Sequence, residues 1–148
     1  MNNIDIVIEQ SMYEFINTWP DKPVDIKLNK LDEQADSMMI QPLSGTEITR
    51  KYVNNNYMGL WSFAVYVRVI NEDTASRIDA RKILQNLESW FTERKEDNSF
   101  ANLPELSNEN TAIKIEMTST PVLAERYDNG TDDYKAIFNL IFKHKEEK

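Results

Sequence analysis

Several residue types are scarce or missing in this sequence of 148 residues. It has no cysteine, which excludes disulfides, thiolate metal sites and cysteine nucleophiles. Its three glycines, Gly45, Gly59 and Gly130, form neither a phosphate-binding loop nor a dinucleotide fingerprint. The only histidine, His144, lies next to the charged end "KEEK", so a Ser-His-Asp triad would depend on a terminal position. Nucleophilic catalysis and nucleotide binding are therefore not expected.

Basic residues are also few: 17 Lys and Arg stand against 25 Asp and Glu, giving a net charge of −8. Phosphate contacts need clustered Lys and Arg, so we expect no sequence-specific nucleic-acid partner. No apolar run approaches the roughly 20 residues that cross a bilayer, and the start "MNNIDIVIEQ" lacks the basic region of a signal peptide. We therefore expect a protein that is retained in the cytoplasm and has no membrane partner.

The length and composition predict one domain over residues 1–148. A hydrophobic fraction of 41% and an aromatic fraction of 10% suffice for a packed core. Near the start, apolar residues recur at steps of three and four and predict a helix that Trp19-Pro20 ends. Its stripe consists of Ile4, Val7, Ile8, Met12, Phe15, Ile16 and Trp19. Residues 21–53 then carry three weak strand patterns, around 24–28, 36–43 and 46–53, for which edge positions are expected.

The segment "GLWSFAVYVRVI", residues 59–70, is the strongest strand pattern in the chain. One face carries Trp61, Phe63, Val65, Val67 and Val69. The second face is also largely apolar, which indicates a central strand. It includes Arg68, which would need a carboxylate or an interface to satisfy its charge.

A second amphipathic helix is predicted after a cap at Asp73 or Thr74, with Arg94 and Lys95 near its C-terminal end. Its apolar stripe consists of Ala80, Ile83, Leu84, Leu87, Trp90 and Phe91. Two closing strands follow. The first places Ile113, Ile115 and Met117 on one face, and the second places Tyr134, Ala136, Phe138, Leu140 and Phe142 on one face. Pro121 is expected to break the ladder between them. The order predicts an α+β fold with a mixed, mainly antiparallel β-sheet and two amphipathic helices packed on one face.

The segment "YDNGTDD", residues 127–133, raises the question of a metal site. An EF-hand loop needs glycine at its sixth position and glutamate at its twelfth. Counted from Asp128, the glycine is third and the twelfth residue is Asn139, so the motif fails. Asp-Asn-Gly favours a chain reversal instead, and its acidic side chains are expected to remain in water. No metal, cofactor or catalytic residue is assigned, although an unidentified carboxylate pair of a small hydrolase stays open as an alternative.

One segment, "TRKYVNNNYMGLW", combines positive charge with aromatic residues in an otherwise acidic chain. Arginine and aromatic residues are enriched at protein interfaces, although an ordinary hairpin with half-buried tyrosines is the alternative. We assign Arg50, Lys51, Tyr52, Tyr57 and Arg68 as a possible protein interface.

Taken together, the opening helix, the strand "GLWSFAVYVRV", the helix "TASRIDARKILQNLESWF" and the closing "STPVLAERYDNGTDDYKAIFNLIF" resemble the tail terminator proteins of long-tailed bacteriophages. Members in Gram-positive phages and prophages are often labelled minor capsid proteins. The resemblance rests on Pro121 before the reversal and on the strand with Tyr134, Phe138 and Leu140, and it spans nearly the whole chain.

The resemblance implies a structural virion protein without enzymatic activity. Subunits similar to this one form a six-membered ring at the head-proximal end of the tail tube after assembly in the host cytoplasm. They stop tail polymerisation and present a surface for head joining. Implied partners are further copies of the chain, the major tail tube protein and the head completion or connector protein. A head completion or connector role for the chain itself is the alternative within the virion.

Overall fold

The computed structural model describes residues 3–33, 36–70, 74–93, 103–106 and 109–145, without the side chains of 3–4 and 74–77. Its elements in chain order are α1 (Asn3–Ile16), β1 (Ile26–Leu28), β2 (Ser37–Pro42), β3 (Glu47–Lys51), the 3-10 turn η1 (Val53–Asn55), β4 (Tyr57–Ile70), α2 (Thr74–Thr92), β5 (Asn110–Arg126) and β6 (Thr131–His144). Two helices and a six-stranded sheet in the described part of the chain confirm the predicted α+β class.

The strands form one sheet in the order β1-β2-β4-β6-β5, with β3 paired to β4 beside this path. Every pairing is antiparallel except that of β1 with β2. The prediction that residues 59–70 form a central strand is confirmed, because β4 pairs with β2, β3 and β6. β1 and β3 lie at edges as expected. The edge prediction is wrong for β2, which lies between β1 and β4.

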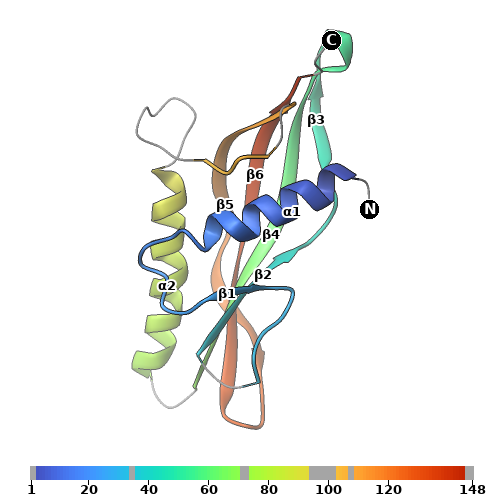
Figure 1. Cartoon of the computed structure of the whole chain (residues 1–148). Helices are drawn as coiled ribbons and strands as arrows, with labels where there is room; N and C mark the ends of the chain where they lie inside the picture. The colour runs from blue at the N-terminus through green and yellow to red at the C-terminus, as the bar shows by residue number, and fades with distance from the viewer. Residues whose placement is uncertain (1–2, 34–35, 71–73, 94–102, 107–108, 146–148) are drawn as a thin grey trace.

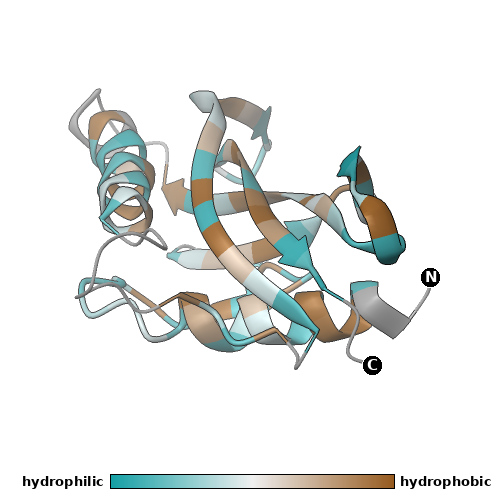
Figure 2. Ribbon diagram, turned by 90° about the horizontal axis from the view of Figure 1, so that it is seen from above, coloured by the Kyte–Doolittle hydropathy of each residue, from teal (hydrophilic) through white to brown (hydrophobic). Residues whose placement is uncertain are grey.

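Both helices pack on one face of the sheet, and the core lies between the helices and that face (Figure 1). Alternation along the strands, visible in Figure 2 as changing hydropathy colours, sends every second side chain of β4 and β6 into this core. The buried strand residues are Trp61, Phe63, Val65, Val67, Val69, Tyr134, Ala136, Phe138, Leu140 and Phe142. Phe15 of α1 stacks on Trp90 of α2 with ring centroids 4.9 Å apart, so the helices also contact one another.

The first helix ends at Ile16, three residues earlier than the sequence predicts. The reason is Asn17, whose Nδ2 donates to the carbonyls of Tyr13 and Ile26. The Ile26 backbone N–H in turn donates to Asn17 Oδ1 at 3.0 Å. One side chain thus satisfies a helix-end carbonyl and holds β1 against the helix end. Trp19 is buried all the same, whereas Val7 of the predicted stripe is exposed.

The predicted break at Pro121 is wrong, because β5 continues through it to Arg126. The ladder is irregular there: three steps along β5, from Ser119 to Val122, match two along β6. β5 is an edge strand, where a proline can be accommodated at such a bulge. Another of the four register shifts in this pairing lies between Ala112 and Lys114, and Ala112 is buried where Ile113 was expected. The predicted residues Asp73, Arg94 and Lys95 lie outside the described residues.

The reversal between β5 and β6 is confirmed. Gly130 has a φ of +87°, and its N–H donates to the carbonyl of Tyr127 at 3.2 Å. Asn129 Oδ1 accepts hydrogen bonds from the N–H and hydroxyl of Thr131. The Asp-Asn-Gly sequence therefore builds the turn through its backbone, as its composition indicates.

Replacing Gly130 with alanine is expected to lower the free energy of unfolding by about 1 kcal/mol, because a β-carbon disfavours positive φ. No atom lies within 4 Å of the place where that carbon would be, so backbone conformation alone is tested. Urea denaturation would measure the loss. Gly130→Asn is the control, since asparagine tolerates this region, and an equal or larger loss for asparagine would contradict the explanation.

Candidate functional site

The acidic segment after the turn is largely buried, which corrects the prediction that its side chains remain in water. Asp132 is 0% exposed and Asp133 is 3% exposed. The cause is their position at the start of β6, where they face basic residues on the neighbouring strands. Asp132 lies opposite Arg126 of β5, and Asp133 lies opposite Arg68 of β4. Only the residues of the turn itself, including Asp128, are exposed.

Arg68 is the centre of a network that joins four parts of the chain. Its Nε and Nη2 donate to the two carboxylate oxygens of Asp133 at 2.7 and 3.0 Å. Its Nη1 donates to the backbone carbonyl of Asp32 at 2.6 Å, and its Cζ lies 4.9 Å from the centre of the Tyr127 ring. The Tyr127 hydroxyl donates to Asp133 at 2.9 Å. This network supplies the carboxylate that the sequence predicts for Arg68.

The same contacts affect the pKa values of Arg68 and Tyr127. Hydrogen bonding to Asp133 raises the pKa of Arg68 above its usual value, and it also raises the pKa of Tyr127. The guanidinium therefore stays charged and the phenol stays protonated at neutral pH. A bidentate, charge-assisted pair of this kind holds the two strands together.

The predicted interface residues do not form one surface. Arg50, Lys51 and Tyr52 are exposed at the tip of the β3–β4 hairpin, which projects from the body in Figure 1. Tyr57 is half-buried, and its ring stacks on His144 with centroids 4.5 Å apart. Arg68 lies at the opposite end of β4. The hairpin tip, defined as residues 50–56, is therefore a surface separate from the Arg68 network.

Sequence analysis did not single out the second face of the sheet as a surface. Both helices pack on the core face, so β2, β4 and β6 present their other side chains on the opposite face, here called the open face. Its apolar members include Met39, Met58, Leu60, Ala64, Tyr66, Ile137 and Ile141, of intermediate exposure except the buried Ala64. In their midst the hydroxyl of Ser62 donates to Asn139 Oδ1 at 2.7 Å. The face thus combines an apolar strip with polar groups that are already paired.

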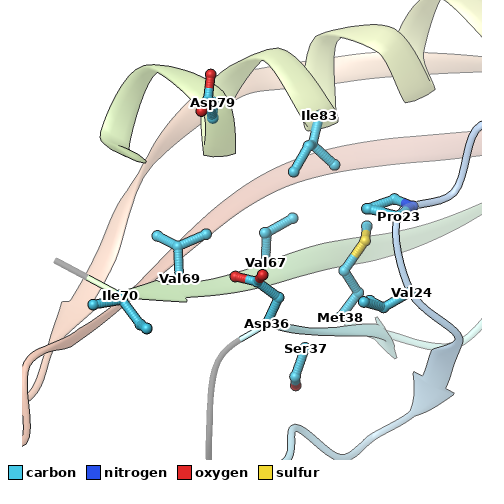
Figure 3. Close-up of a pocket in the computed structure, with 10 residues that line it drawn as sticks. All are labelled: Pro23, Val24, Asp36, Ser37, Met38, Val67, Val69, Ile70, Asp79 and Ile83. Atoms are coloured by element: carbon cyan, nitrogen blue, oxygen red, sulfur yellow. The ribbon is translucent and has the colours of Figure 1, made fainter. Parts of the chain in front are cut away.

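A depression of about 430 Å³ lies at one end of the open face. Its lining includes Arg68, Tyr127, Asp133, Met39, Tyr66, Glu125 and Lys135. A second hollow, of about 380 Å³, lies between α2 and the sheet and is here called the α2 pocket (Figure 3). Ile83 of α2 points toward Val67 and Val69 of β4 in this view. Pro23, Val24, Met38 and Ile70 complete its apolar lining, and Asp36 and Asp79 are its charged residues.

In the part of the chain that the structure describes, we find neither a cluster of metal ligands nor a catalytic triad. No group of three or more His, Asp or Glu residues there could hold a metal ion. His144 Nδ1 lies 2.9 Å from Asn110 Oδ1, and none of the hydrogen bonds among the described residues joins it to a serine or threonine hydroxyl. No helix within the same residues is long and apolar enough to cross a membrane.

Sequence reasoning missed the α2 pocket and the exposed Val53 of the hairpin tip. The pocket joins residues from four segments, so no local pattern marks it. Val53 could have been noticed as an apolar residue in a polar turn between two strands. Compared with known proteins, the sequence matches no family model and no curated protein.

Proposed function

We propose that the protein is a tail terminator of a long-tailed phage: a structural subunit that forms a ring at the head-proximal end of the tail tube. The observation that carries this proposal is the open face. Among the described residues no helix covers one face of a sheet whose strands reach 14 and 17 residues, and that face carries an apolar strip. Partly exposed apolar side chains gathered on one face are typical of sites of protein–protein contact.

The position of the charged groups supports the same role. Arg68, Asp133 and Asp132 are paired within the chain, so the strand ends are rigid before any partner binds. A preorganised sheet contacts a second subunit at a lower ordering cost than a flexible segment would. The ends of the open face carry Lys135, Glu125 and Lys143, which suits a polar rim around an apolar centre.

The net charge of −8 supports a place beside the DNA passage. A ring of acidic subunits repels the phosphate backbone and keeps DNA from adhering as it moves between head and tail. The ring needs contacts with further copies of the chain, with the tube protein below it and with the head connector above it. Three separate surfaces, the open face, the hairpin tip and the α2 pocket, are available for these contacts.

Deleting the gene from its parent phage is expected to give tubes longer than the normal tail and heads without tails. Electron microscopy of lysates would measure tube length and the fraction of joined particles. Normal tails attached to heads would reject the proposal. Tails of normal length that fail to join would instead indicate a head completion protein.

The open face can be tested in the same system by complementation. Ile137→Glu puts a charge into its apolar strip and is expected to abolish complementation while the free energy of unfolding changes by about 1 kcal/mol or less. Ile6→Glu is the matched control, because Ile6 is exposed on α1 and lies outside the open face. Full complementation by Ile137→Glu would show that the open face makes no essential contact.

A further inference from the structure

The hairpin tip has a fixed shape that presents an apolar residue. Val53 is 80% exposed, the largest exposure among the large hydrophobic side chains of the described residues. The N–H of Tyr52 donates to the carbonyl of Asn56 at 2.8 Å, which closes the turn. Asn54 and Asn55 have φ values of 63° and 64°, a conformation that asparagine tolerates. The turn is therefore formed before any partner binds.

The tip is also basic. Arg50 and Lys51 are both exposed, and neither takes part in an ion pair among the described residues. Arg50 Cζ lies 5.3 Å from the centre of the Tyr52 ring, which holds its charge beside the apolar end of the hairpin. The surface that the tip offers is thus an apolar side chain flanked by two cations and a tyrosine.

The α2 pocket has the complementary character. Its lining combines apolar side chains from α2, β2 and β4 with the carboxylates of Asp36 and Asp79, and no Lys or Arg is among the described residues that line it. Both aspartates are exposed, and the ion pairs described in the structure include neither of them. A volume of about 380 Å³ is at the small end of ligand sites, of the size that one or two side chains occupy.

The two features lie at opposite ends of one strand. Tyr57, next to the tip, and Val69, in the pocket, are the first and thirteenth residues of the 14-residue β4. At about 3.3 Å per residue the twelve steps between them span roughly 40 Å. A tip therefore cannot enter its own pocket, and a second copy of the chain is the occupant that carries the matching charge.

We propose that the hairpin tip of one copy occupies the α2 pocket of the next copy, with Val53 against the apolar lining and Lys51 and Arg50 beside Asp79 and Asp36. Because the two surfaces differ, the contact is head-to-tail, and repeating it gives a closed ring or an open filament. This inference rests on the proposed ring function and names the contact between its subunits.

Disulfide cross-linking tests the contact directly, because the chain has no cysteine of its own. Full-length Val53→Cys is mixed with a tagged Ile70→Cys variant and oxidised, and heterodimers are separated by size. Ile70 is exposed and lies at the pocket, so the change is mild. The expected heterodimer yield is about tenfold above that of Val53→Cys with tagged Ile6→Cys, which corresponds to a preference of 1.4 kcal/mol. Equal yields with both partners would overturn the proposal.

A charge exchange tests the pairing within the contact. Adding Lys51→Glu to the Val53→Cys variant is expected to lower the yield about two- to fivefold, as for an exposed ion pair. Adding Asp79→Lys to the Ile70→Cys partner should restore it, since the charges are then reversed on both sides. An unchanged yield with Lys51→Glu, or no recovery with Asp79→Lys, would overturn the assigned pair.

Complementation with Val53→Glu separates failure of this contact from failure of the proposed function. We expect it to fail to complement the deleted phage. Full complementation, combined with overlong tubes in the deletion mutant, would reject the hairpin contact and leave the terminator function supported. Normal joined tails in the deletion mutant would reject the terminator function, whereas the cross-link would still establish the contact between copies.

Discussion

Replacing Arg68 with alanine is expected to lower the free energy of unfolding by about 3 kcal/mol. The side chain of Asp133 is only 5% exposed, and that of Arg68 is 14% exposed. Removing the guanidinium leaves the carboxylate buried with the Tyr127 hydroxyl as its remaining side-chain donor. It also leaves the carbonyl of Asp32 without the donor that Arg68 provides. Urea denaturation followed by circular dichroism would measure the loss.

Two control variants compare the buried pair with an exposed ion pair and with an apolar replacement. Lys27→Ala removes the exposed pair with Asp32, whose side chains are 46% and 48% exposed, and should change stability by about 0.5 kcal/mol or less. The double variant Arg68→Met/Asp133→Leu should recover most of the loss, because apolar residues of similar size can replace a buried pair. If Arg68→Ala were no more harmful than Lys27→Ala, the network would not hold the strand ends together.

The sequence predicts most clearly those strands in which burial of one face makes every second side chain apolar. In β4 and β6 every second residue is apolar and enters the core, so the period of two could be identified without tertiary information. The end of α1 could not be identified in this way, because it depends on Asn17 binding the backbone of Ile26, nine residues away. Helix propensity alone would continue to Trp19.

The acidic segment shows a different limit of sequence reasoning. Its composition correctly predicts the turn, because Asn129 and Gly130 act on their own backbone. The burial of Asp133 depends on Arg68, which is 65 residues away and lies opposite it only after β4 and β6 have paired. The side chain of Asp133 was therefore predicted to remain in water, whereas its pairing with Arg68 allows it to be buried. Arg68 itself gave the usable signal, as a cation on a largely apolar strand.

The interface residues show the same dependence on tertiary structure. Arg50, Lys51 and Tyr52 are neighbours in sequence and remain neighbours at the hairpin tip. Arg68 was grouped with them by residue type, but β4 carries it to the far end of the sheet. The α2 pocket was not predictable at all, because its lining comes from the segment before β1, from β2, β4 and α2.

Replacing Gly59 with alanine is expected to lower the free energy of unfolding by about 3 kcal/mol. Gly59 pairs with Phe142, and a β-carbon on it would lie 2.4 Å from Phe142 Cζ. Phe142 is 0% exposed, so surrounding atoms restrict the shift that its ring would need. The glycine therefore creates the space in which an aromatic ring covers the neighbouring strand.

The explanation requires coupling between these two residues, which a double-mutant cycle measures in urea. Phe142→Leu alone should cost about 1 to 2 kcal/mol by leaving a cavity. Gly59→Ala in that background should cost at least 1 kcal/mol less than in the unaltered protein, because the added methyl group then occupies part of the cavity. Additive losses would show instead that alanine at position 59 acts through the backbone of β4. That outcome would resemble Gly130→Ala, where no side chain is near enough to collide and only the backbone conformation is at stake.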